Sequence, residues 1–327
     1  MKHTVILAFD NTMATTIFGP MDILCQAGRL WNRVNGVKQT AYFEVDVASP
    51  DGRPVRCQNG ITVNPHCALE DIRTTDLIII ASLTKIDRAL ACFPRILPWL
   101  CGQYHRGAHI ASICTGVYLL AESGLLDGKT ATIHWGFAER FAQRYPRIQV
   151  RPERMIIDHG DLFCSAGTNA GLDLSLYLVS KYCGRRTALQ CAKAMVLDMG
   201  RRLQTPYYDF LLGKNHQDKR IQEIQEKLEA DPAASIDYDS LAREHGMSRR
   251  SMERRFKTAT GKTPLAYLQR LRVEAAKHML EGGKVPFSQI AYSLGYEDVA
   301  FFRKLFTRVT GLRPKEYYLN TRNAVEA

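Results

Sequence analysis

The chain has 327 residues, a formal net charge of +11 at pH 7, and 46% hydrophobic and 24% charged residues. This length predicts two domains, and the ordinary balance of apolar and charged residues excludes a largely disordered chain. No apolar run reaches the roughly 18 residues of a membrane span, and Asp10 interrupts the first apolar stretch too early for a secretory signal. We therefore expect a cytoplasmic protein, and the positive charge favours a polyanionic partner.

Nine cysteines are scattered along the chain without Cys-x-x-Cys pairs. An odd number without paired spacing fits reduced thiols better than a disulfide framework or a zinc site. We expect no bound metal and no cofactor.

The first two thirds of the chain alternate strand-length apolar runs with helical patterns such as Pro20–Leu30 and Phe93–Arg106. The apolar runs are continuous rather than alternating, which is typical of parallel strands buried on both faces. They cover residues 3–9, 42–49, 76–82 and 108–113. This order predicts an α/β doubly wound, flavodoxin-like domain over residues 1–205.

Cys114 directly follows the last of these runs, in the segment ASICTGVYLLAESG. In a doubly wound sheet the ligand crevice lies beyond the carboxyl ends of the strands, so a strand-to-helix turn would project this side chain into the crevice. The free N–H groups and positive end of the following helix favour a thiolate there. The residues alone leave an equal alternative, that Cys114 is one more small core residue.

Three segments resemble the PfpI-like branch of the class I glutamine amidotransferase superfamily, and the likeness covers roughly residues 1–200. The segments are FGPMDIL (18–24), ASICTGVYLLAESGLLDGKTATIHW (111–135) and IIDHGDLFCSAGTNAGLDLSLYLVSKYCG (156–184). In that family the elbow carries a reactive cysteine, and the resemblance places it at Cys114. Enzymatic members commonly add a carboxylate from the loop after the first strand.

The catalytic partners that the resemblance implies are missing. The acid position falls on Thr16, and Thr115 stands where protease members have a histidine; no late His-x-Glu, as in amidotransferases, is found. A nucleophile without acid or base is a weak catalyst, so we expect no enzyme and assign no catalytic residue to this degenerate elbow. The domain is interpreted as a binding fold whose candidate ligand-binding residues are Thr16, Phe18, Cys114, Thr115 and His134, although an isolated histidine such as His134 is more often structural.

Near residue 213 the composition changes to charged, helix-forming sequence. We expect a linker over residues 206–218 and a second, all-α domain over residues 219–327. The charge there is clustered rather than spread evenly, and the clusters lie on a recurring helical pattern.

The most basic cluster is SRRSMERRFKTATGK (248–262), in which Glu253 is the single acid. On a helix, Arg250, Glu253, Arg254 and Lys257 share one face by i, i+3, i+4 and i+7 spacing. A charged helix face is usually just solvated, but here a short helical segment and a turn come before it. A helix, a glycine-containing turn and a basic helix together indicate a helix-turn-helix unit.

The same pattern occurs again over residues 288–318. Matching positions are offset by 49 before the turn and by 50 after one inserted residue, which indicates an internal duplication. The pairs are Leu241 with Ile290, Ala242 with Ala291, Gly246 with Gly295, Phe256 with Phe306, Gly261 with Gly311, Pro264 with Pro314 and Tyr267 with Tyr317. We expect a long helix at about Pro264–Glu281 to join the two units, and Leu241, Ile290, Phe256 and Phe306 to lie in their cores.

Residues 221–320 resemble the AraC/XylS family DNA-binding domain, most closely in IAYSLGYEDVAFFRKLFTRVTGLRPKEYY. The resemblance implies that the second helix of each unit contacts base edges. The candidate DNA-binding residues are Arg249, Arg250, Glu253, Arg254, Lys257, Val299, Ala300, Arg303, Lys304 and Arg308. We expect phosphate contacts from Lys257, Lys262, Arg308 and Lys315.

A PfpI-like domain followed by an AraC-type domain resembles the GlxA-like family of bacterial transcriptional regulators. That resemblance implies a homodimeric, sequence-specific regulator that binds double-stranded DNA and a small nitrogen-containing effector, and that acts with RNA polymerase. Two alternatives stay open: a cysteine-dependent amidase or hydratase carrying a DNA-binding module, and an oxidation sensor at Cys114.

Overall fold

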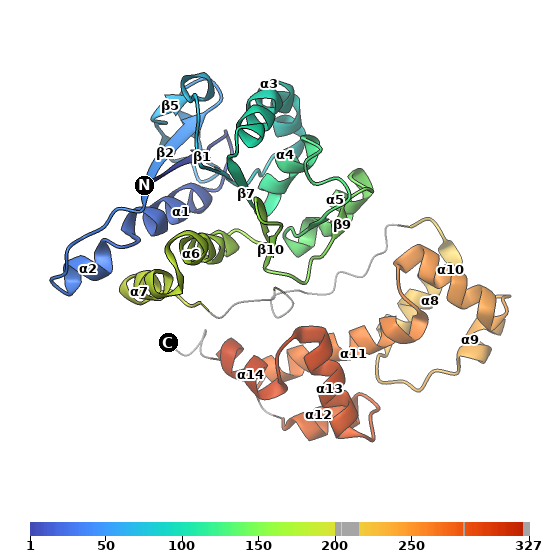
Figure 1. The fold of residues 1–327 in the computed structure, drawn as a ribbon. Helices are drawn as coiled ribbons and strands as arrows, with labels where there is room; N and C mark the ends of the chain where they lie inside the picture. Colours follow the sequence, from blue (N-terminus) through green and yellow to red (C-terminus); the bar gives the residue numbers. More distant parts are fainter. Residues whose placement is uncertain (200–203, 205–215, 284, 323–327) are drawn as a thin grey trace. The chain divides into compact units, whose positions relative to one another are not determined.

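The computed structural model describes residues 1–199, 204, 216–283 and 285–322. The chain divides into two compact units, Met1–Gln204 and Thr205–Ala327, each with hydrophobic cores of its own (Figure 1). Most of the predicted linker lies outside the described residues. Within these ranges, no helix has the length and apolar character that a membrane span requires.

A mainly parallel sheet forms the centre of the first unit, with strand order β10-β11-β7-β6-β1-β2-β5. Only the β10–β11 pair is antiparallel. The strands are β1 (Lys2–Leu7), β2 (Phe43–Ser49), β5 (Cys67–Ala68), β6 (Leu77–Ile80), β7 (His109–Ile113), β10 (Ile156–Asp158) and β11 (Leu162–Ser165). Separate pairs are formed by β3 (Val55–Arg56) with β4 (Thr62–Val63) and by β8 (Thr130–Ala131) with β9 (Gln149–Val150).

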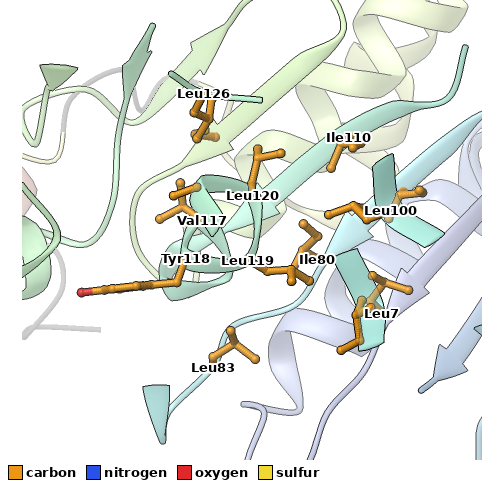
Figure 2. Close-up of a cluster of buried hydrophobic side chains, with 14 of the residues drawn as sticks. Leu7, Ile80, Leu83, Leu100, Ile110, Val117, Tyr118, Leu119, Leu120 and Leu126 are labelled. Atoms are coloured by element: carbon orange, nitrogen blue, oxygen red, sulfur yellow. The ribbon is translucent and has the colours of Figure 1, made fainter. Parts of the chain in front are cut away.

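Helices cover both faces of this sheet, which confirms the predicted α/β doubly wound fold. The helices of this unit are α1 (Thr15–Gln26), α2 (Leu30–Val34), α3 (Ile86–His105), α4 (Val117–Glu122), α5 (Ala138–Arg144), α6 (Ala170–Cys183) and α7 (Arg185–Met195). Figure 2 shows part of one core, where Leu7, Ile80 and Ile110 of the central strands lie with Leu100 of α3 and Val117 of α4. The continuous apolar strands are therefore buried on both sides of the sheet.

Two helices begin earlier than the sequence predicted. Helix α1 starts at Thr15 and contains Pro20, and α3 starts at Ile86 and contains Pro94 and Pro98. The predicted starts near prolines were wrong because burial of an apolar face outweighs the backbone hydrogen bonds that the prolines cannot donate.

The second unit is helical throughout its described part, as predicted. Its helices are α8 (Lys219–Ala230), α9 (Tyr238–Glu244), α10 (Arg249–Thr260), α11 (Pro264–Glu281), α12 (Phe287–Ser293), α13 (Val299–Thr310) and α14 (Pro314–Arg322). The long helix α11 contributes Tyr267 and Leu268 to one core, and Val273 and Ala276 to the other. The predicted joining helix is therefore confirmed: it closes the first helix-turn-helix unit and opens the second.

The two cores repeat the same contacts. The rings of Phe256 and Tyr267 meet edge to face with centroids 5.2 Å apart, and those of Phe306 and Tyr317 do so at 5.6 Å. All four side chains are at most 1% exposed. These contacts confirm the predicted duplication at the level of side-chain packing.

Candidate nucleic-acid interface and the cysteine elbow

Helix α10, the second helix of the first helix-turn-helix unit, is anchored at its start and along one face. The Ser248 hydroxyl accepts a hydrogen bond from the Ser251 N–H at 3.3 Å and caps the helix. Met252 and Phe256 are fully buried. The opposite face is left to solvent, and the basic residues lie there.

Arg250, Arg254 and Lys257 are exposed along α10. Within the described part of the chain, none of their side chains has a hydrogen-bond or ion-pair partner. Their i, i+4, i+7 spacing places the three cations on one strip of the helix. This strip is a row of uncompensated positive charges available to an anionic partner.

Arg249 and Glu253 contact each other. Arg249 donates to Glu253 at 3.1 Å and to Asp239 of α9 at 3.1 Å, and its guanidinium carbon lies 5.9 Å from the centre of the Tyr238 ring. About half of each of the Arg249 and Glu253 side chains is exposed, so this pair is weak in water. DNA can therefore compete for both residues.

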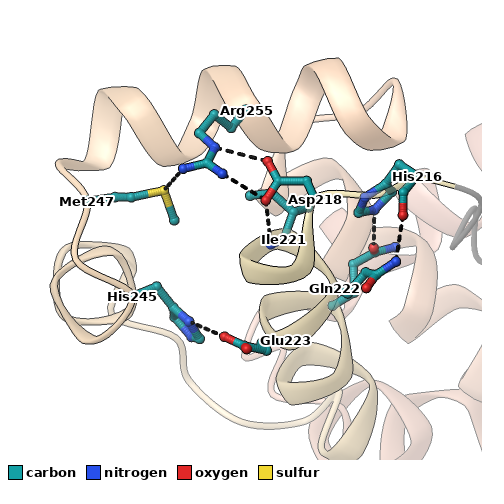
Figure 3. Close-up of polar contacts among 9 residues, drawn as sticks. His216, Asp218, Ile221, Gln222, Glu223, His245, Met247 and Arg255 are labelled. Carbon is teal, nitrogen blue, oxygen red and sulfur yellow. Dashed lines mark hydrogen bonds and ion pairs between the residues drawn. The ribbon is translucent and has the colours of Figure 1, made fainter.

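Arg255 has a different role from its basic neighbours. Its guanidinium donates to both carboxylate oxygens of Asp218, at 3.0 and 2.8 Å, as Figure 3 shows. Asp218 also caps α8 by accepting from the Ile221 N–H at 3.4 Å. Arg255 therefore holds α10 against the start of α8, and charge clustering alone does not distinguish it from Arg254.

Helix α13 is the equivalent of α10 in the second helix-turn-helix unit. Asp298 caps it by accepting from the N–H groups of Ala300 and Phe301 at 2.8 and 2.9 Å. Its exposed positions include the predicted Ala300, Arg303, Lys304 and Arg308. The predicted contact residue Val299 is half-buried, because it packs against the core.

Phe301 was missed by the sequence analysis. Its side chain is 46% exposed on α13. The i, i+3, i+7 relation to Lys304 and Arg308 was the signal that could have found it. An exposed aromatic ring on the basic face of such a helix fits apolar contact with thymine methyl groups.

The two other predicted phosphate ligands differ in exposure. Lys315 is exposed, whereas Lys262 is half-buried. Burial, together with the nearby positive charge of Arg270, lowers the pKa of Lys262. Lys262 is therefore the less accessible of the two to a phosphate.

Cys114 lies on the predicted strand-to-helix turn. It follows β7 directly and has a left-handed backbone φ of +54°. A 3₁₀ turn over Cys114–Gly116 leads into α4. Gly116 is required there, because a Cβ atom would stand 2.7 Å from the backbone oxygens of Ile80 and Ala81.

The sequence left a thiolate in the crevice and a small core residue as equal alternatives for Cys114, and the structure places the residue in a hydrophobic core. The residue is 5% exposed, and burial raises the pKa of its thiol. Interactions with the backbone of Thr115 and His134 and with the side chains of Thr115 and Thr168 lower that pKa, but burial outweighs them. Cys114 is therefore a protonated thiol at neutral pH.

Thr16 and Thr115 are buried with their hydroxyls already bonded. Thr16 donates to the Met13 carbonyl at 2.7 Å and accepts from the Ser82 N–H at 3.1 Å. Thr115 donates to the Leu83 carbonyl at 2.6 Å and accepts from the Leu83 N–H at 2.8 Å. Both hydroxyls thus hydrogen-bond neighbouring backbone segments, and neither threonine is left open to a ligand.

Of the five predicted ligand-binding residues, the structure brings Cys114, Thr115 and His134 together. His134 Nδ1 accepts from the Gly136 N–H at 3.1 Å, and the ring stacks on Trp135 with centroids 5.1 Å apart. Burial lowers the pKa of His134. Phe18, on α1, is 40% exposed.

A cavity of about 780 Å³ opens elsewhere on the carboxyl edge of the sheet, where β1 and β2 end and α3 begins. Its wall combines aromatic and apolar side chains with charges of both signs. The lining residues used below are Phe9, Asp10, Glu70, Lys85, Arg88 and Trp99. Lys85 and Arg88 have no ion-pair partner among the residues that the structure describes.

Comparison with known proteins follows the same division of the chain. Residues 2–181 match the model of the DJ-1/PfpI family, and residues 241–319 match that of a helix-turn-helix domain. In the crystal structure of Drosophila melanogaster DJ-1beta, the shared fold covers 60% of this chain and 98% of that chain, with TM-score 0.52 and 18% identity.

Two relatives align with most of the chain. The HTH-type transcriptional regulator CdhR of Pseudomonas aeruginosa is 30% identical over 80% of this chain and 77% of its own length. The HTH-type transcriptional regulator GbdR of the same species is 27% identical over 95% of this chain and 82% of its own length. These relatives confirm the expectation of a regulator rather than an enzyme. The chain belongs to the DJ-1/PfpI family, within the HTH-type transcriptional regulators that carry an AraC-type DNA-binding domain at the carboxyl end.

Proposed function

We propose that this regulator recognises one specific duplex sequence with both helix-turn-helix units at once. The observation that carries the proposal is the repeated architecture, in which α10 and α13 each bury one face and leave a basic face exposed. Arg250 and Arg254 read base edges in the first segment, and Arg303 and Lys304 in the second. Lys257 and Arg308 meet phosphates, which position the protein without selecting sequence.

Selection of binding sites from randomised duplexes by the full chain tests this proposal. We expect a consensus of two short conserved segments whose centres lie about 10 base pairs apart, since successive major-groove faces repeat at that interval. A chain that enriches no sequence, or a single segment only, contradicts recognition by both units.

The α/β unit, Met1–Gln204, serves as a sensor and joins two chains in a homodimer. The regulator works in the cytoplasm, where it acts with RNA polymerase. The complete sheet and its two cores make this unit a stable scaffold for such contacts. Sedimentation of the full chain measures the oligomeric state, and a monomer at micromolar concentration contradicts the dimer. Transcription from a template bearing the selected site tests the action on polymerase.

The effector is a zwitterionic, nitrogen-containing metabolite such as an amino acid or a betaine-like molecule. The cavity beside β1 and β2 supports this choice, because Lys85 and Arg88 suit a carboxylate while Asp10 and Glu70 suit a positively charged nitrogen. Phe9 and Trp99 supply apolar and aromatic surface between the charges. Its volume is in the range of small-ligand sites.

The elbow at Cys114 and His134, where the sequence analysis placed the ligand, is the other candidate location for the effector. Calorimetry with a set of amino acids and betaines on the full chain distinguishes the two locations. We expect Arg88→Ala to weaken binding at least tenfold and Cys114→Ala to leave it nearly unchanged, since one charge-assisted hydrogen bond has that magnitude. The opposite result places the effector at the elbow, and heat with no compound contradicts a sensor of this class.

Effector binding alters DNA recognition by a population shift. If the metabolite binds one dimer arrangement more tightly, it favours that arrangement and changes how the two DNA-binding domains are presented. An effector that leaves DNA affinity, DNA bending and transcription unchanged contradicts this coupling.

A further inference from the structure

The two helix-turn-helix units touch each other directly, in addition to their connection through α11. The contact joins the loop between α8 and α9 to the turn between α12 and α13. A Cβ atom built on Gly295 of that turn would stand 2.9 Å from the backbone oxygen of Ala233 in the loop. Gly295 also has a φ of +80°. The first helix-turn-helix unit therefore meets the second helix-turn-helix unit at Gly295, where there is no room for a side chain.

Arg272, near the middle of α11, lies at this contact. Its Nε donates to the Pro232 carbonyl at 2.7 Å, and its Nη2 donates to the Ala234 carbonyl at 2.9 Å. Its guanidinium carbon lies 5.1 Å from the centre of the Tyr296 ring. Arg272 of the connecting helix α11 thus hydrogen-bonds the α8–α9 loop of the first helix-turn-helix unit. The same side chain lies over Tyr296 in the α12–α13 turn of the second helix-turn-helix unit.

The carbonyls that Arg272 binds are held in place by their own loop. The Asp231 carboxylate accepts from the Ala233 N–H at 3.0 Å, and the Asp231 carbonyl accepts from the Ala234 N–H at 3.2 Å. The loop therefore presents its carbonyls in a fixed geometry that a planar guanidinium can bond at two points. A lysine would supply only a single point charge there.

We propose that Arg272 sets the orientation of α10 relative to α13 and thereby the spacing of the two DNA segments that the chain reads together. The inference rests on the proposed two-segment recognition and adds a positioning residue that does not itself touch DNA. Helix α11 has 18 residues and is about 27 Å long. A small bend near its centre displaces α10 relative to α13 by ångströms. That displacement is enough to break the base contacts in one of the two DNA segments.

The first experiment measures binding of the full chain and its Arg272→Ala and Arg272→Lys variants to three kinds of duplex. One carries the selected two-segment site, another has one base pair inserted between the segments, and the third keeps only the first segment. We expect Arg272→Ala to bind the intact site about tenfold more weakly, the scale of one mismatched base pair, and the single segment within twofold of wild type. The inserted base pair should penalise the variant less than wild type, and Arg272→Lys should fall between the two.

A matched glycine pair tests the same contact without changing a charge. Gly295→Ala and Gly246→Ala alter equivalent turn positions with φ of +80° and +67°, so both introduce similar backbone strain. At Gly246 the nearest atom to a new Cβ is an Arg220 side-chain nitrogen at 3.9 Å, whereas at Gly295 it is the Ala233 oxygen at 2.9 Å. Only Gly295→Ala should therefore change the preferred spacing between segments.

Several outcomes overturn the inference. If Arg272→Ala weakens binding to the single-segment and two-segment duplexes equally, Arg272 only stabilises the first helix-turn-helix unit. If it changes neither affinity nor spacing preference while the variant stays folded by circular dichroism, the contact has no effect on recognition. If the wild-type chain selects no two-segment site, the proposed function fails first, and that result is visible before any variant is made.

Discussion

The Arg255 guanidinium and the Asp218 carboxylate form a two-point contact between α10 and the residue that caps α8, with N–O distances of 3.0 and 2.8 Å. Arg254, one residue earlier, is exposed and has no partner among the described side chains. Two adjacent arginines in one basic cluster thus serve different purposes. One stabilises the fold of the unit, and the other is free to contact DNA.

Arg255→Met should lower the free energy of unfolding of the helical C-terminal unit by about 1 kcal/mol. The variant keeps an apolar stem but loses a charge-assisted contact, and the expected loss is small because the Arg255 side chain is 37% exposed and solvent screens the pair. Urea unfolding followed by circular dichroism measures the change. Arg254→Met is the matched control and should stay within about 0.5 kcal/mol of wild type; equal losses would show that the Asp218 contact adds no stability.

Arg254→Ala should cost about 1–3 kcal/mol at one base pair and relax specificity there, because base-edge contacts carry sequence information. Lys257→Ala should instead weaken all sequences nearly uniformly and reduce the salt dependence of binding by about one charge. Binding titrations against single-base variants of the selected site, at several salt concentrations, distinguish the two. A uniform loss for Arg254→Ala would assign it to the phosphate backbone.

Cys114 should react slowly with iodoacetamide at pH 7, because burial raises the pKa of its thiol and keeps it protonated. The rate should increase as the pH rises above the thiol's ordinary value of 9.0. Quantifying the modified peptide by mass spectrometry measures the rate. The half-buried Cys25 is an internal reference in the same unit and should react faster.

Rapid modification of Cys114 at neutral pH would revive the enzyme and oxidation-sensor alternatives. For the sensor, DNA affinity is compared before and after peroxide in wild type and Cys114→Ser. We expect the two proteins to respond identically, and a response confined to wild type would favour a redox role.

His134 should make the first unit less stable in mild acid. Burial lowers the pKa of His134 below its ordinary value of 6.5, so the unfolded state binds the proton more tightly than the folded state. The stability contributed by neutral His134 is present above pH 6.5 and is lost as the pH falls through that value toward the folded pKa. Thermal unfolding of wild type and His134→Gln between about pH 7 and pH 5 measures this, and the variant should show the flatter profile. Identical profiles would contradict the assignment.

Much of the architecture followed from the sequence, because local periodicity and repetition carry that information. Continuous apolar runs predicted the parallel sheet, and the offset of the two helix-turn-helix patterns placed Phe256 and Phe306 in equivalent cores. The joining helix was predicted at its observed bounds, Pro264–Glu281. Such features depend on which face of an element is apolar, and residue order alone shows this.

The tertiary structure decided which charged or polar side chains are free. Helical spacing places Arg254 and Arg255 side by side in a basic cluster, and only the position of Asp218 at the start of α8 separates their roles. Similarly, the elbow pattern located Cys114, but burial by surrounding segments raised the pKa of its thiol. Arg272 was not singled out at all, since its partners lie in two loops distant in sequence. Solvation and partner geometry depend on the whole fold, and no local pattern encodes them.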